Sequence, residues 1–182
     1  MPLSKLSEQP IDQVLARLSA NNTNGFNNGI AAQAPNYSLP SDFININFSL
    51  PSVNFFLGQI DFDNQEISGY IAYPAASLYT LESANQNLEK FHQFSGAIRV
   101  IFEVAMSWDS MTGRGIPFEY YSNCIEDVVV NCINCLQNQN WASPVSYNGQ
   151  IQCKRGPIIF AGNNLRQRIG FSMIFVVDTA VN

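Results

Sequence analysis

Four cysteines are the most reactive side chains in this sequence of 182 residues, and Cys132 and Cys135 form a Cys-x-x-Cys pair. This spacing occurs in zinc sites and in thiol redox motifs. A zinc site would need two further ligands from Cys124, Cys153 and His92, and neither of these cysteines has a partner at ligand spacing. The helical cysteines fall on or beside an apolar stripe, where a free cysteine packs as a small hydrophobic residue. We expect buried thiols, with a zinc or redox site as the alternative.

His92 is the only histidine, so a Ser–His or Cys–His mechanism would have to use it. It stands in the segment KFHQFSG, and the sequence contains no nucleophile elbow. We expect a structural or exposed imidazole and predict no catalytic residue. The chain is therefore expected not to be an enzyme, and a small soluble enzyme that uses cysteine or His92 is the alternative.

Two further groups of residues have the composition of ion-binding sites. Asp61, Asp63 and Glu66 form an acidic cluster that lacks the twelve-residue spacing and central glycine of an EF-hand loop. Gly113 and Gly115 lie between a predicted strand and a predicted helix, where phosphate-binding loops occur, but no Gly-x-x-x-x-Gly-Lys-[Ser/Thr] motif is present. We therefore predict no cofactor and no metal site.

The long strand that would position these groups is clearest in the segment from Ile98 to Trp108. Its even positions are all apolar, whereas its odd positions include Arg99 and Glu103. A period of two over this length predicts a strand with one buried face. Arg99 and Glu103 are expected on the outer face, as a surface ion pair.

A helix is predicted next, because apolar residues recur at helical spacing between Tyr121 and Leu136. Asn123 and Glu126 resemble a capping box at its start. Alternation then predicts strands over 145–153 and 169–177. The Asn148–Gly149 pair is the alternative signal for a tight turn inside the first of these strands.

The first half of the chain gives weaker signals. Apolar residues at helical spacing from Ile11 to Leu18 predict a short N-terminal helix. Residues 21–36 consist of Asn, Gly and small side chains, so we expect a flexible loop or arm without regular structure. One or two strands are expected within 43–62, and two short extended segments, over 70–73 and 77–81, are expected on either side of Pro74.

Together these elements predict one α+β domain over residues 1–182. We expect an antiparallel sheet with one long helix packed on a face, plus a short N-terminal helix. A chain of this length with 46% hydrophobic residues has enough apolar surface for such a core.

The surface is expected to be polar without being strongly charged. Charged residues make up 13% of the chain, against a typical share of about 25%. The chain contains 21 Asn and 12 Gln. The net charge of −5 argues against broad nucleic-acid binding. The charge is uneven, because residues 1–150 hold 5 basic and 13 acidic side chains, whereas residues 151–182 hold four basic residues and Asp178 alone.

Neither a secretory signal nor a membrane span is expected. The first twenty residues contain no continuous apolar stretch, and the longest apolar runs elsewhere are short. We therefore expect the chain to fold in a reducing cytoplasm, where its cysteines stay free.

The order of elements resembles the tail terminator and neck proteins of bacteriophages. It comprises an N-terminal helix, a β segment, the stretch YIAYPAASLYTLES, the strand AIRVIFEVAMSW, the helix SNCIEDVVVNCINCLQ and a closing hairpin that ends in RIGFSMIFVVDTA. The similarity covers residues 10–180 and lies in pattern and order. In that family a small α+β domain forms a ring, usually hexameric, on the end of the tail tube and beneath the head connector.

The resemblance implies a structural virion protein of the head–tail junction. Its partners would be further copies of itself in a ring, the tail tube, a sheath where one exists, and the neck or connector, and DNA would pass without tight binding. The resemblance brings no catalytic residues with it. Ring contacts are expected at edges and loops, with residues 109–117 and 21–36 as candidates. A monomeric or trimeric binding or capsid-decoration module is the alternative.

Overall fold

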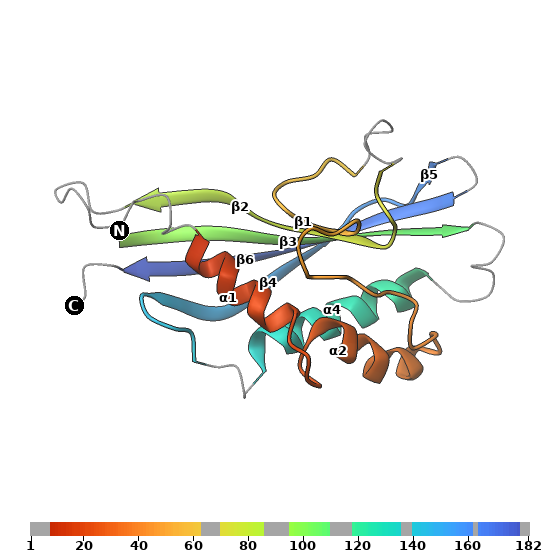
Figure 1. Ribbon diagram of the computed structural model, residues 1–182, viewed down its shortest axis with the longest axis horizontal. Coiled ribbons are helices and arrows are strands. Elements are labelled where there is room, and N and C mark those ends of the chain that lie inside the picture. Colours follow the sequence, from red (N-terminus) through yellow and green to blue (C-terminus); the bar gives the residue numbers. More distant parts are fainter. Residues whose placement is uncertain are drawn as a thin grey trace.

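The computed structural model describes residues 8–62, 70–85, 95–109, 118–135, 140–161 and 164–178. Within these residues a six-stranded sheet forms one layer and three α-helices form the other (Figure 1). The sheet has the order β1-β2-β3-β6-β4, and β5 pairs with β6 outside this path. The predicted α+β class is therefore confirmed.

Two long strands form the centre of the sheet. β3 (Ser95–Asp109) and β6 (Asn164–Asp178) each contain 15 residues and pair antiparallel over their whole length. The apolar even positions of β3 from Ile98 to Met106 are buried, as are the odd positions of β6 from Gln167 to Val177. The rings of Phe102 and Phe171 stack at 6.2 Å between centroids. The parity predicted for the long strand is confirmed, so Arg99 and Glu103 lie on the opposite face.

Shorter strands flank this pair. β2 (Ala75–Asn85) pairs antiparallel with β3, and β4 (Val145–Arg155) pairs antiparallel with β6. β1 (Phe55–Leu57) runs parallel to β2, and β5 (Ile159–Ala161) runs antiparallel to β6. The sheet is thus antiparallel except at β1. The turn weighed for Asn148–Gly149 is instead an irregularity within β4, where Gly149 has a φ of +82°.

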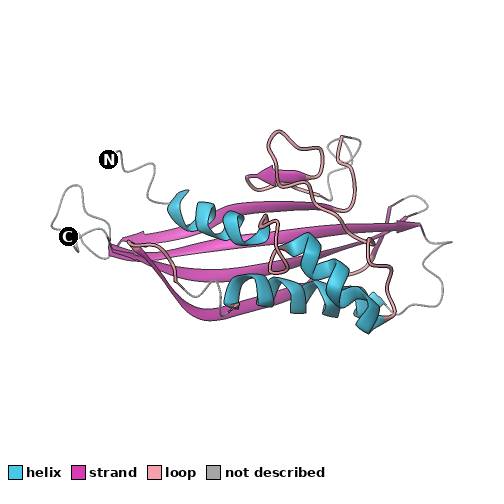
Figure 2. Cartoon of the chain, turned by 60° about the horizontal axis from the view of Figure 1, so that its bottom comes forward, coloured by secondary structure: helices cyan, strands magenta, loops and turns pink. Residues whose placement is uncertain are grey.

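The helices cover one face of the sheet (Figure 2). α1 (Glu8–Leu18) and α4 (Phe118–Asn134) contribute to a single core with the inward side chains of the strands. α4 begins at Phe118, so Asn123 and Glu126 lie inside the helix and the predicted capping box is wrong. Both side chains instead accept hydrogen bonds from the guanidinium of Arg155 on β4.

The expectation that residues 21–36 lack regular structure is wrong. This segment contains α2 (Phe26–Gln33) and the start of a 3-10 helix, η2 (Ala34–Tyr37). Phe26, Ile30 and Ala34 are fully buried, because their spacing of four places them on one helical face. Their apolar surface supplies the driving force that the surrounding Asn residues lack.

The asparagines of this segment also have structural roles. Asn27 bonds the backbone of Ile46 twice, through its side-chain amide and its carbonyl oxygen. Asn28 donates to the carbonyl of Asn22 at 2.7 Å. The arm proposed as a ring contact is therefore part of the helical layer.

Candidate functional site on the open face of the sheet

The sequence predicts that the cysteines are buried thiols, and this prediction is confirmed for two of the four. Cys124 and Cys132 are buried in the core, whereas Cys135 and Cys153 are partly buried, and none of the four forms a disulfide. Burial raises the pKa of Cys124 to about 11 and that of Cys132 to about 12. Among the described residues no group of three or more His, Cys, Asp or Glu side chains is placed to hold a metal ion.

These pKa values predict slow thiol chemistry. The thiolate is the reactive form, and at about pH 8 a thiol with a pKa near 11 is ionised to roughly one part in a thousand. We expect Cys124 and Cys132 to resist iodoacetamide in the native protein and to react fully once the chain is unfolded in denaturant. Peptide mass spectrometry of both samples measures this. Rapid native labelling of Cys132 would contradict the buried position.

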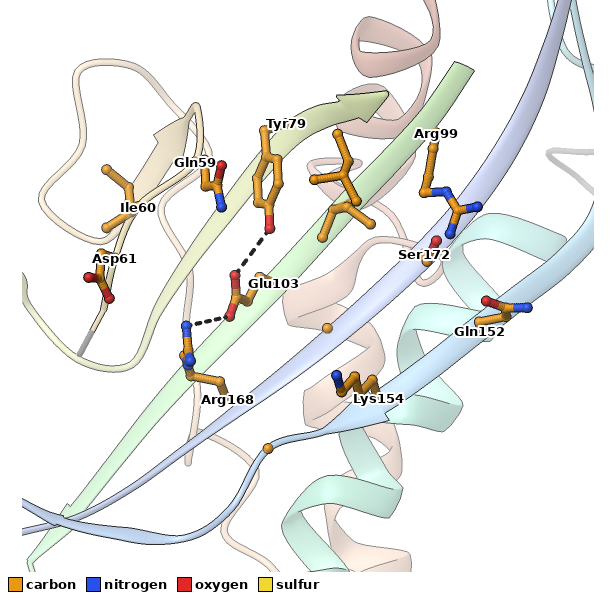
Figure 3. A pocket seen from close by; sticks show the side chains of 14 residues that line it. Gln59, Ile60, Asp61, Tyr79, Arg99, Glu103, Gln152, Lys154, Arg168 and Ser172 are labelled. Carbon is orange, nitrogen blue, oxygen red and sulfur yellow. Dashed lines mark hydrogen bonds and ion pairs between the residues drawn. The ribbon is translucent and has the colours of Figure 1, made fainter. Parts of the chain in front are cut away.

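Most other residues weighed for chemistry lie outside the described residues. These are His92, Asp63, Glu66, Gly113 and Gly115. Asp61 is described, and it lies at the rim of a hollow on the face of the sheet opposite the helices (Figure 3). The structure thus places one of the three candidate acidic residues at a candidate site, and the other two lie outside the described residues.

The hollow has a volume of about 830 Å³. Strands β2, β3, β6 and β4 form its floor, and the loop after β1 forms one rim. It is lined by Gln59, Ile60, Asp61, Tyr79, Leu81, Arg99, Ile101, Glu103, Gln152, Lys154, Gly156, Arg168, Gly170 and Ser172. Outward-facing positions of adjacent strands meet here because the register brings residues of the same parity side by side.

Glu103 is the centre of the polar network in the hollow (Figure 3). Its carboxylate accepts a hydrogen bond from the Tyr79 hydroxyl at 3.5 Å and pairs with the Arg168 guanidinium at 3.4 Å. The Glu103 side chain is only 13% exposed, so it is not the exposed surface charge that the sequence predicts. Burial, together with the charge of Glu103, raises the pKa of Tyr79. Tyr79 therefore stays protonated at neutral pH and acts as a donor, not as a base.

Positive charge exceeds negative charge in the lining. Arg99, Lys154 and Arg168 come from three adjacent strands, whereas Glu103 and Asp61 supply the carboxylates. Glu103 on β3 and Lys154 on β4 are both register partners of Gly170 on β6, which lies between them. The space between their side chains is open because Gly170 has no side chain. A Cβ atom at Gly170 would meet no atom closer than 4.0 Å. The hollow is thus suited to hold polar or anionic side chains of another molecule.

Exposed apolar side chains lie on this face both in the hollow and beyond it. Leu81 on β2 is 53% exposed, and Ile174 and Val176 on β6 are 39% and 49% exposed. The register places Ile174 beside Arg99 and Val176 beside Ala97. Ring contacts are expected at edges and loops, and the structure shows exposed apolar side chains on this face as well. The sequence of β6 indicated such a face, because residues 173–177 are apolar at odd and at even positions.

The arrangement joins a charged hollow to exposed apolar side chains on one face of the sheet, and it is suited to binding another molecule. In the described part of the chain, no helix is long and apolar enough to cross a membrane. Comparison with protein-family models and with curated proteins finds no match for this chain.

Proposed function

We propose that this chain is a structural virion protein that forms a ring at the head-proximal end of a phage tail. In this role it caps the tail tube and joins it to the neck while DNA passes through. The observation that carries the proposal is the open face of the sheet, with its hollow and its strip of Leu81, Ile174 and Val176. The order of elements described above supplies the choice of family.

The open face favours assembly because of its mixed composition. An antiparallel sheet often leaves one face to solvent, and such a face is normally polar. Here neighbouring strands present aliphatic side chains next to arginines and a lysine. Apolar area bordered by charged groups is typical of protein–protein contacts, in which buried apolar side chains supply affinity and the polar rim supplies orientation.

The charge of the chain fits a ring through which DNA passes. A net charge of −5 gives the protein little general attraction for phosphates. A pore that retained DNA would hinder its passage, so weak binding suits this role. The partners would be further copies of the chain, with six as the expected number, the tail tube, a sheath where one exists, and the connector.

Location in the native particle tests the proposal. We expect averaged electron microscopy images of particles to place this chain at the head–tail junction with ring symmetry. Absence from the junction, or presence there without ring symmetry, would overturn the proposal. Labelling over the capsid surface would favour the decoration module instead.

A variant of the open face tests the observation itself. We expect Ile174→Arg to lower incorporation into particles by roughly tenfold or more, because it places a charge in the apolar strip. Val53→Arg is the matched control, because Val53 is exposed but lies in the loop before β1. Equal incorporation of the two variants would argue against the open face as the contact surface.

A further inference from the structure

The open face changes from polar to aliphatic along β6. The outward positions of this strand are Arg168, Gly170, Ser172, Ile174 and Val176 in that order. Because a strand rises about 3.3 Å per residue, Gly170 and Val176 lie about 20 Å apart. An occupant that lies along β6 would therefore contact the polar hollow at one end and aliphatic side chains at the other.

Lys154 gives the β4 side of the hollow its positive charge. Its side chain is exposed, and within the described part of the chain its ammonium forms no ion pair or hydrogen bond. Gly170, its register partner on β6, contributes no side chain that could cover it. In the next row of the sheet, Gln152 and Ser172 offer an amide and a hydroxyl as further hydrogen-bond donors (Figure 3). This side of the hollow can therefore receive a negatively charged acceptor.

The carboxylates of the hollow lie away from this side. Glu103 is on β3, with β6 between it and β4, and it already binds Tyr79 and Arg168. Asp61 lies on the loop after β1, and β1 and β4 are at opposite edges of the sheet. Positive charge is therefore separated from negative charge across the hollow, and the β4 side is cationic.

The surroundings of Lys154 favour a protein carboxylate over a nucleic acid. Ile101 pairs with Ser172 in the floor of the hollow, and Ile174 follows on β6, so aliphatic side chains lie among the cations. Binding to a phosphate backbone draws on clustered Lys and Arg, and the Glu103 carboxylate in this floor would repel it. A carboxylate flanked by aliphatic side chains matches both the charge and the apolar area of the face.

We propose that the open face binds a segment of the tail or neck partner in which acidic side chains alternate with aliphatic ones. An acidic side chain enters the hollow and pairs with Lys154, and aliphatic side chains cover Ile174 and Val176. The proposal rests on the proposed function, and it names the chemistry of the partner at the open face. The apolar contact supplies affinity, and the ion pair fixes the direction of the segment along β6.

A peptide titration on the purified full chain tests this chemistry. The probe is a fluorescein-labelled peptide of alternating leucine and glutamate, and glutamine replaces each glutamate in the matched peptide. We expect fluorescence anisotropy to show binding of the glutamate peptide that is tighter by about tenfold, with a difference that shrinks at high salt. Equal affinities, or no binding of either peptide, would overturn the proposal. Tighter binding of labelled single-stranded DNA than of the glutamate peptide would also reject it.

Variants of Lys154 locate the binding. Lys154→Gln should weaken binding of the glutamate peptide by about tenfold and change binding of the glutamine peptide little, because only the ion pair is lost. Lys154→Arg keeps the charge and should keep the affinity. Asn131→Asp is the control, because Asn131 is exposed on α4 and the variant changes the net charge by the same amount. Equal affinities of the Lys154→Gln and Asn131→Asp proteins would contradict the assignment to Lys154.

Zero-length cross-linking in the native particle separates this contact from the proposed ring. Lys154 is the only lysine in the described part of the chain, so a carbodiimide-coupled peptide that contains it reports on this site. We expect mass spectrometry to find its amine joined to an aspartate or glutamate of a different protein. A particle that contains the ring without this product would reject the contact and leave the ring standing. Binding of the glutamate peptide at Lys154, together with particles that lack the ring, would reject the ring alone.

Discussion

Replacing Phe102 with alanine should lower the free energy of unfolding by about 3–5 kcal/mol, the usual cost of truncating a buried phenylalanine. Phe102 is fully buried and connects the two layers of the protein. Its ring meets Phe26 of α2 edge to face at 5.8 Å and stacks on Phe171 of β6. Its removal leaves a cavity between helix and sheet that two aromatic neighbours cannot easily fill. Denaturant titration followed by circular dichroism measures the loss.

Glu103→Ala, one residue along the same strand, is the matched control. It removes no core side chain, but it leaves Arg168 and Tyr79 without their shared acceptor. We expect a cost of about 1 kcal/mol, which is the typical net value of a partly exposed hydrogen-bonded charge. From the sequence alone a smaller cost is expected, because the strand pattern places Glu103 outside without indicating its partners. Equal losses for the two variants would contradict the assignment of one core face.

Strand parity and helix periodicity were predictable because burial on one side leaves a direct record in the sequence. The alternation from Ile98 onward places Phe102 inside, and the stripe that begins at Tyr121 places Cys132 inside. Both predictions depend only on neighbours along the chain. The β3–α4–β4–β6 order follows from the same patterns, since an amphipathic helix between strands packs on their apolar face.

The hollow was not predictable by this reasoning. It depends on the register that brings Tyr79 of β2 opposite Ile101 and places Glu103 and Lys154 on either side of Gly170. No local pattern specifies which residues of two distant strands become neighbours. Gly170 within a strand was the available signal, because a missing side chain in a sheet often marks close approach or open space.

The sequence-based prediction for residues 21–36 was wrong because it relied on the amino-acid composition of the segment and not on the spacing of its apolar residues. Five of the eight residues from Asn21 to Asn28 are asparagine, a residue type that favours loops. Phe26, Ile30 and Ala34 nevertheless stand at intervals of four, and this weak stripe is sufficient for a short helix once the core covers it. Tertiary packing therefore decides the structure of a segment whose propensity points elsewhere.

Replacing Gly25 with alanine tests this corrected interpretation directly. Gly25 precedes α2, and a Cβ atom there would lie 1.9 Å from the backbone oxygen of Ala20. Backbone cannot rotate away as a side chain can, so the turn that leads into α2 must open. We expect a loss of about 3 kcal/mol in the free energy of unfolding, at the upper end of the usual cost of overpacking.

Gly170→Ala makes the same chemical change at a position where a Cβ atom fits, because the nearest atom to it would lie 4.0 Å away. We expect this control to change the free energy of unfolding by well under about 1 kcal/mol. Denaturant titrations of both variants decide between two structures for the segment. In a flexible loop, Gly25→Ala would be as harmless as the control, since the chain would move aside. A large difference between the two glycines is expected only if the turn between Ala20 and Gly25 is closed and α2 is packed against the sheet.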